Sequence, residues 1–153
     1  METHYYPVTL NWTNNRQGTL SVPTLPDTIT VATPPEFAGG IPGIWSPEHL
    51  FVAAVSSCLM TTFLAIAANL RLEYTGFSCA ATGKLEQENG KYRITEVELK
   101  PVVTVADASQ AERAQRVLQK AEQYCLISNS VNSTVTMVPE IRIADDALLS
   151  QTE

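Results

Sequence analysis

The stretch SPEHLFVAAVSSCLMTTFLAIAAN, residues 46–69, decides the fold of this chain. It opens with a helix start, because Ser46 is a capping residue, Pro47 suits the first helical position and Glu48 is an acid in the first turn. From Leu50 to Ala68 no residue is charged. A helix that is apolar on every side lies either at the centre of a globular domain or across a membrane. Its serines, threonines and alanines and the absence of a flanking basic cluster favour the buried helix, so we predict no membrane interaction.

The residues before this helix have the pattern of a small β structure. Residues 4–12 are rich in strand formers, and the turn sequence NNRQG leads from them into a second strand at Thr19–Val22. We therefore predict a β-hairpin with Arg16 at or near its tip. A third short strand is predicted at Thr28–Ala32. The segment ATPPEFAGGIPGIW, residues 32–45, contains too many prolines and glycines for regular structure.

A long β-hairpin is predicted after the central helix. Alternate residues from Phe77 to Leu85 share one apolar face, and Asn89-Gly90 tolerates the positive φ angles of a tight hairpin turn. The returning strand alternates as far as Val105. Its Pro101 lacks a backbone N–H, which predicts an edge strand or a bulge at that position.

Helical periodicity returns over Asp107–Asn129. One apolar stripe predicts the buried face. It begins at Ala114 and continues three, four, seven and eleven residues later with Val117, Leu118, Ala121 and Cys125. A last strand is predicted at roughly 134–143, followed by a polar tail that we expect to fray. The order β-β-β-α-β-β-α-β predicts one α+β domain over residues 1–153, with a core from about 5 to 143.

Composition excludes several classes of function. A chain of 153 residues fits one domain, and a net charge of −6 with scattered Lys and Arg argues against nucleic acid as a partner. The start of the chain lacks the basic and apolar segments of a signal peptide, and three cysteines do not make a disulfide framework, so we predict a cytoplasmic protein. Charged residues make up only 17%, against about 25% in typical domains, which favours oligomerisation.

Cysteines are the residues most suited to chemistry. Cys58 and Cys125 lie on the inward faces of two predicted helices, where they could meet as a redox pair or simply pack as small apolar residues. Cys79, on the apolar face of a strand, is interpreted as structural. His4 and His49 have no metal-ligand spacing to any cysteine, and no phosphate-binding glycine loop occurs, so we predict neither a metal nor a nucleotide cofactor.

A reactive cysteine needs a group that stabilises its thiolate. Arg16 is a candidate cation for Cys58, and Glu48 could hold the guanidinium through a bidentate ion pair. The alternatives remain open, since Arg16 suits a solvated hairpin tip and an acid such as Glu48 is favoured at any helix N-terminus.

Taken together, these residues resemble the OsmC/Ohr family, the osmotically inducible protein C and organic hydroperoxide resistance proteins. The resemblance covers roughly residues 5–143. It rests on SPEHLFVAAVSSCLMTTFLAIA around Cys58 and on AEQYCLISNSV around Cys125. By this resemblance Cys58 is the peroxidatic cysteine and Cys125 the resolving cysteine. Glu48 matches the family glutamate, and Arg16 falls where the Ohr branch carries its arginine.

The resemblance implies an intertwined α+β homodimer that reduces organic hydroperoxides in oxidative-stress defence. A sulfenic acid on Cys58 would condense with Cys125 to a disulfide, which a cellular dithiol would reduce. The alternative is a non-catalytic member that acts as a redox sensor or binds a small apolar ligand.

Helix geometry also favours a dimer. If residues 47–69 form one straight helix, the ten residues from Glu48 to Cys58 span about 15 Å along the axis and point about 80° apart. One chain could then hardly bring both side chains directly into one site. Either a break separates them, or a partner subunit supplies the Arg16–Glu48 pair to Cys58. We expect the second, because a partner would also bury the uncharged helix.

Overall fold

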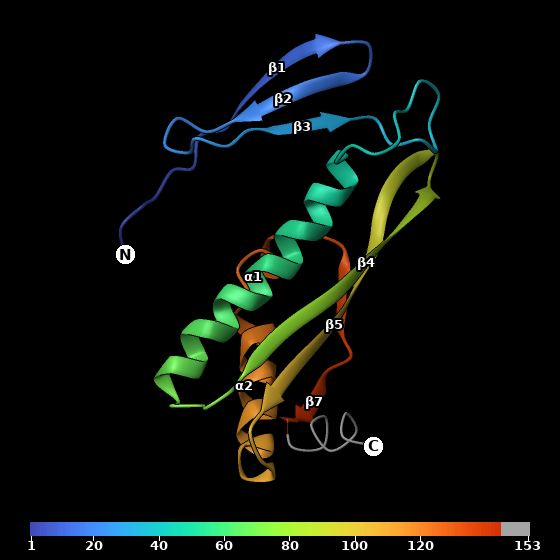
Figure 1. The fold of residues 1–153 in the computed structure, drawn as a ribbon. Coiled ribbons are helices and arrows are strands. Elements are labelled where there is room, and N and C mark those ends of the chain that lie inside the picture. Colours follow the sequence, from blue (N-terminus) through green and yellow to red (C-terminus); the bar gives the residue numbers. More distant parts are fainter. Residues whose placement is uncertain (145–153) are drawn as a thin grey trace, which may run out of the picture. The chain divides into compact units, whose positions relative to one another are not determined.

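The central helix, α1, runs without interruption over Pro47–Asn69 in the computed structural model, which describes residues 1–144 (Figure 1). Its start is a reciprocal cap. The Ser46 hydroxyl accepts from the backbone N–H of His49 at 3.2 Å, and the backbone N–H of Ser46 donates to His49 Nδ1 at 3.3 Å. This is a capping box in which histidine takes the place of the usual glutamate or glutamine. The helix start predicted from the sequence is confirmed.

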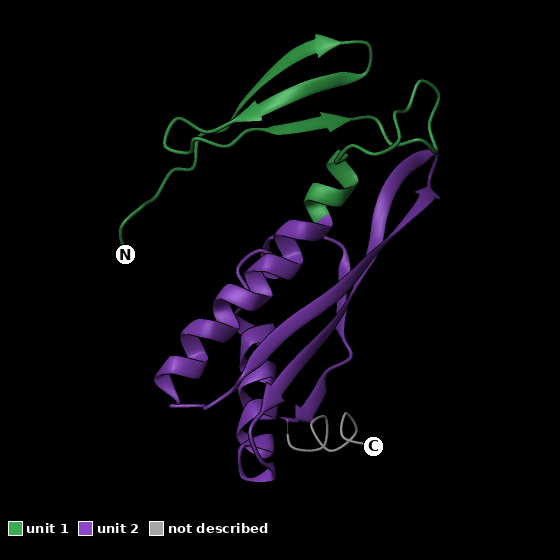
Figure 2. Cartoon of the chain, in the orientation of Figure 1, with its two compact units in different colours: residues 1–51 green, residues 52–153 purple. Residues whose placement is uncertain are grey.

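The chain divides into two compact units, Met1–Phe51 and a second that begins at Val52 (Figure 2). The first contains an antiparallel sheet of three strands in the order β1-β2-β3, with β1 at Thr9–Asn14, β2 at Gln17–Ser21 and β3 at Ile29–Ala32. Asn14 pairs with Gln17, so the predicted hairpin turns at Asn15-Arg16, and Asn15 has a φ of 44°. The hairpin is confirmed with Arg16 in its turn, although β1 begins at Thr9 rather than at residue 4.

The second unit is built on a long antiparallel hairpin of β4, Gly76–Glu88, and β5, Lys91–Val105. The predicted turn at Asn89-Gly90 is confirmed, with φ angles of 52° and 77°. Alternation is confirmed as well over Val97–Val105, where every second residue of β5 is fully buried: Val97, Leu99, Pro101, Val103 and Val105. The other face of the hairpin is mostly polar, and its residues are exposed or half-buried.

Pro101 does not mark an edge or a bulge, so that prediction is wrong. β5 is an interior strand: besides β4 it pairs in parallel with β6, Thr134–Met137, and with β7, Glu140–Ile143. Pairing with β6 ends at Leu99 and pairing with β7 begins at Val102. Leu99 directs its carbonyl toward this second side, since it accepts from Val138, so Pro101 faces the same side at the gap between β6 and β7. Its missing N–H therefore interrupts no ladder.

The second helix is shorter than predicted. A 3₁₀ turn at Ala108–Gln110 leads into α2, Ala111–Tyr124, and another 3₁₀ turn follows at Ser128–Ser130. The predicted apolar stripe of α2 is fully buried, which confirms its inward face. Cys125 lies just after the helix, with extended backbone angles, and not within it as predicted. The predicted last strand is two strands, β6 and β7, and the tail expected to fray lies outside the described residues from 145 on.

One side of α1 packs within the second unit. The Phe63 ring lies 4.9 Å from the ring of Phe77 and 5.3 Å from that of Tyr74, measured between centroids. Other sides of the helix are exposed, including Met60 and Leu64. By length and composition α1 is apolar enough to cross a bilayer, a test that core helices of soluble proteins also pass, and 22% of its most apolar window is buried inside the chain. The rest of this apolar window is not buried within the described chain.

Candidate functional site

Cys58 and Cys125 meet inside the second unit, one from the middle of α1 and one from the end of α2. Both residues are buried, and neither forms a disulfide. A hydrogen bond joins the two sulfur atoms. The sequence left open whether these cysteines meet, and the structure brings their thiols together.

The surroundings of Cys58 favour its thiolate. Burial by itself raises the pKa of this thiol, because a charge is less stable away from water. Four hydrogen bonds outweigh burial, and the pKa of Cys58 is lowered as a result. They come from the backbone N–H of Ile127, the thiol of Cys125, the hydroxyl of Thr62 and the backbone N–H of Leu126. Thr62 Oγ1 lies 3.9 Å from the Cys58 sulfur, one helical turn further along α1.

Cys125 is affected in the opposite direction. Burial raises the pKa of its thiol, and a thiolate on Cys58 raises it further by repulsion and by accepting the Cys125 proton in a hydrogen bond. Hydrogen bonds from the Ser128 hydroxyl and from the Ser128 backbone N–H oppose this effect without cancelling it. The pair therefore loses its first proton from Cys58, while Cys125 keeps its own.

The early end of α2 makes these hydrogen bonds possible. Had the helix continued, the N–H groups after Cys125 would have bonded to carbonyls one turn earlier. Instead the chain turns at Cys125, where the Cys125 carbonyl accepts from Asn129 at 3.0 Å, and the intervening amides reach the sulfur atoms. Sequence reasoning missed Thr62, Ser128 and the amides of Leu126 and Ile127, and no Gly or Pro in CLISNS signals where the helix ends.

Cys79 stands apart from this pair. It lies on β4, its thiol donates to the carbonyl of Ala80, and burial raises its pKa. The hydrogen bond that opposes burial comes from the backbone of Lys100. These surroundings stabilise the neutral thiol, as a structural cysteine requires.

The two other residues singled out in the sequence belong to the first unit. Arg16 is exposed and lines an apolar hollow of about 240 Å³ with Leu10, Trp12 and Pro47 among others. Its side chain lies against Gly39, where an added Cβ would come within 3.0 Å of Arg16 Nε. One carboxylate oxygen of Glu48 is buried and has no hydrogen-bond partner. Within residues 1–144, no ion pair joins Arg16 to Glu48.

The described residues contain no group of three or more His, Cys, Asp and Glu side chains placed to hold a metal ion.

Comparison with known proteins assigns the family. The chain resembles the solved structure of an OsmC-like protein of unknown function from Vibrio cholerae, with 25% identity, a TM-score of 0.78 and coverage of 90% of this chain and 99% of that one. It also resembles an organic hydroperoxide resistance protein from Elizabethkingia anophelis, with 25% identity, a TM-score of 0.73 and coverage of 94% of this chain and 99% of that one. An organic hydroperoxide resistance protein OsmC from Legionella pneumophila has 19% identity and a TM-score of 0.73, with coverage of 94% of this chain and 100% of that one. No curated protein sequence matches the chain. The family model of OsmC-like proteins matches residues 40–140, and this chain belongs to that family.

Proposed function

We propose that this protein is a thiol peroxidase that reduces organic hydroperoxides, with Cys58 as the peroxidatic cysteine and Cys125 as the resolving cysteine. The observation that carries the proposal is the hydrogen-bonded pair of thiols with opposite pKa shifts. A peroxidatic cysteine must be a thiolate, and a resolving cysteine must lie within reach of it. Two structural relatives bear the name of organic hydroperoxide resistance proteins, which supports this choice of substrate.

The reaction proceeds in two oxidative steps and one reductive step. The Cys58 thiolate attacks the distal oxygen of ROOH, the O–O bond breaks, and the alkoxide takes up a proton and leaves as ROH. Cys58 is then a sulfenic acid. The Cys125 sulfur attacks the Cys58 sulfur, water leaves, and a disulfide forms before Cys58 reaches an irreversible oxidation state. A dithiol reductant then restores both thiols and becomes a disulfide itself.

We further propose that the working form is a homodimer in which Arg16 and Glu48 of one subunit serve Cys58 of the other. Two observations support the dimer. The apolar surface of α1 that this chain leaves exposed includes Met60 and Leu64, and β1 is exposed along its whole length. A buried carboxylate oxygen on Glu48 without a partner also suits a site that a cation completes. The family implies cytoplasmic action, which agrees with three free thiols.

The decisive experiment compares single cysteine variants in the consumption of cumene hydroperoxide with dithiothreitol as reductant. Cys58→Ser should abolish turnover, whereas Cys79→Ser, with the same substitution on β4, should retain it. Turnover at the wild-type rate by Cys58→Ser would refute the mechanism. The competing function, a redox sensor or an apolar-ligand-binding protein, predicts a slow reaction that does not saturate with substrate. The peroxidase predicts saturation with bulky hydroperoxides and little reaction with hydrogen peroxide.

A further inference from the structure

The turn after α2 carries one side chain that binds directly to a reacting sulfur atom and that the mechanism above does not use. Ser128 Oγ donates to Cys125 Sγ at 3.3 Å. Ser128 begins the 3₁₀ turn Ser128–Ser130, whose position is fixed by the hydrogen bond from the Asn129 N–H to the Cys125 carbonyl at 3.0 Å. The hydroxyl is therefore held beside the sulfur by the same turn that ends the helix.

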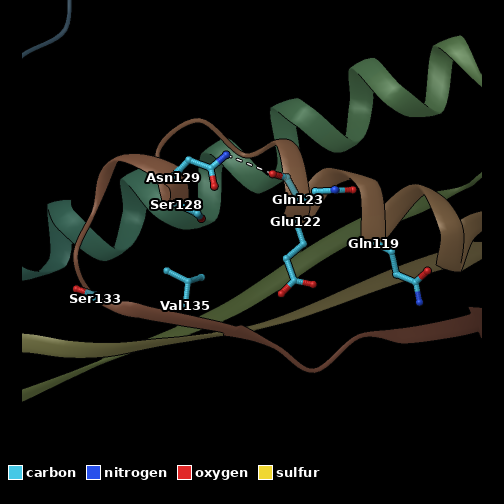
Figure 3. A pocket seen from close by; sticks show the side chains of 7 residues that line it. All are labelled: Gln119, Glu122, Gln123, Ser128, Asn129, Ser133 and Val135. Carbon is cyan, nitrogen blue, oxygen red and sulfur yellow. Dashed lines mark hydrogen bonds between the residues drawn. The ribbon is translucent and has the colours of Figure 1, made fainter.

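Ser128 also lies at the border between the buried thiols and the surface. It lines a polar hollow of about 590 Å³, formed with Gln119, Glu122, Gln123, Asn129, Ser133 and Val135 (Figure 3). Most of these side chains are uncharged hydrogen-bonding groups. The titratable groups near the Cys125 thiol are Cys58, which faces it from α1, and Glu122, which lines the hollow on α2.

We propose that Ser128 stabilises the negative charge on the Cys125 sulfur when the Cys58–Cys125 disulfide closes and when it reopens. The inference rests on the proposed function and adds a residue to it. The inference is supported by two hydrogen bonds from Ser128 to this sulfur, one from its hydroxyl and one from its backbone N–H. Both bonds lower the pKa of Cys125. These bonds matter because burial and the neighbouring Cys58 both disfavour the thiolate form of Cys125.

Charge on Cys125 arises twice in the cycle. During closure Cys125 loses its proton, its sulfur attacks the Cys58 sulfenic acid, and hydroxide leaves with a proton as water. During reduction a thiolate of the external dithiol attacks Cys58, which is 8% exposed while Cys125 is fully buried, and Cys125 leaves as the thiolate. The second thiol of the reductant then displaces Cys58. A leaving thiolate of lower pKa departs faster, so the same donors assist both steps.

The test measures the two oxidative steps separately in wild type and in Ser128→Ala. Reduced protein is mixed with substoichiometric cumene hydroperoxide, and samples quenched over time are analysed for the sulfenic acid, trapped by dimedone, and for the disulfide by mass spectrometry. Oxidation of Cys58 should stay within about twofold of wild type. Disulfide closure at pH 7 should slow about tenfold, as expected when a thiolate loses one hydrogen bond. Reduction of the disulfide by dithiothreitol should slow by a similar factor.

The pH profile separates an electrostatic role from a structural one. Without the hydroxyl the thiolate of Cys125 is less stable, so its pKa rises and the closure rate should reach its plateau at higher pH. Wild type and Ser128→Ala should therefore converge in alkaline solution. Ser128→Thr and Ser128→Val have side chains of similar shape, but only threonine keeps a hydroxyl. The closure rate of Ser128→Thr should therefore stay close to wild type, whereas that of Ser128→Val should fall as in Ser128→Ala. Ser133→Ala is the matched control, because Ser133 lines the same hollow but donates to the carbonyl of Ile94 at 2.6 Å.

Two results would overturn the inference: closure at the wild-type rate in Ser128→Ala, or slowing by one constant factor at every pH. Closure is also measured with diamide, an oxidant that converts thiol pairs into disulfides without any hydroperoxide. If the wild type fails to react with cumene hydroperoxide but closes with diamide, the proposed function fails. The diamide comparison of Ser128→Ala with wild type still decides the role of Ser128 in that case.

Discussion

Gly83→Ala tests the packing that positions Cys58. Gly83 lies on the inner face of β4, directly beneath α1, and a Cβ added there would come within 2.5 Å of Val52 Cγ2. Ordinary contact begins at about 3.4 Å. The two groups must therefore separate by about 0.9 Å, the difference between 3.4 and 2.5. Valine has one strongly preferred χ1 rotamer in a helix, so its side chain cannot simply turn away and the backbone of α1 must move.

We expect Gly83→Ala to lower the free energy of unfolding by about 1–3 kcal/mol, the usual cost of an overpacked core. Urea unfolding followed by circular dichroism measures it. Val52 lies six residues before Cys58 on α1, so the shift should also lengthen the hydrogen bonds from Leu126 and Ile127 and slow disulfide closure. Val52→Ala removes the clashing methyl groups, and the double variant should be more stable than the sum of the two single effects predicts.

Gly76→Ala is the control on the same strand, because its added Cβ would meet Thr104 only at an ordinary 3.6 Å. Its effect on stability should be small or favourable, since alanine restricts the unfolded chain. Unchanged stability in Gly83→Ala, or a double variant that shows no coupling to Val52→Ala, would refute the proposed close packing of α1 on β4.

Three further predictions concern the cap, the thiolate and the assembly. Ser46→Ala should cost about 1 kcal/mol in urea unfolding by removing the α1 cap, and no loss of stability would contradict the capping role. Thr62→Val should raise the pKa of Cys58, so that alkylation of the thiolate increases over a higher pH range than in wild type. Thr61→Val is the control and should leave this range unchanged, because the Thr61 hydroxyl donates to the carbonyl of Cys58 and not to its sulfur. Sedimentation at micromolar concentration should show a dimer, whose interface we expect to bury on the order of 2,000 Å². A folded, fully active monomer would exclude the dimer.

Local signals in the sequence predicted the parts of the fold that short-range chemistry controls. Ser46 and Pro47 located the start of α1, and Asn89-Gly90 located the tight turn between β4 and β5. The partner of Ser46 was missed for a simple reason. His49 occupies the position where the capping pattern has Glu or Gln, and its ring nitrogen performs the same function.

The position of Pro101 in an interior strand could not be predicted from the residues around it. A proline in a strand predicts an edge, because its neighbours are assumed to run the full length of the sheet. Here two short strands share one side of β5 and leave a gap opposite Pro101. Parallel pairing between segments distant in the sequence leaves no local pattern, so the arrangement could not be predicted from the strand itself.

The assignment of roles to the two cysteines depends on the same kind of nonlocal detail. From the sequence, Cys58 and Cys125 are two apolar-face cysteines, and only resemblance to a family distinguishes them. In the structure, the two sulfur atoms differ in the hydrogen bonds they accept. Cys58 accepts from two amides of the turn, from Thr62 and from Cys125, whereas Cys125 accepts from the hydroxyl and the backbone N–H of Ser128. Cys125 gives its proton to the shared hydrogen bond, so Cys58 is the thiol that ionises first. The end of α2 at Tyr124 creates this asymmetry, because it frees the amides of Leu126 and Ile127 to face the sulfur on α1. A substitution that extended α2 through Cys125 would thus remove the difference between the two thiols while leaving both cysteines in place.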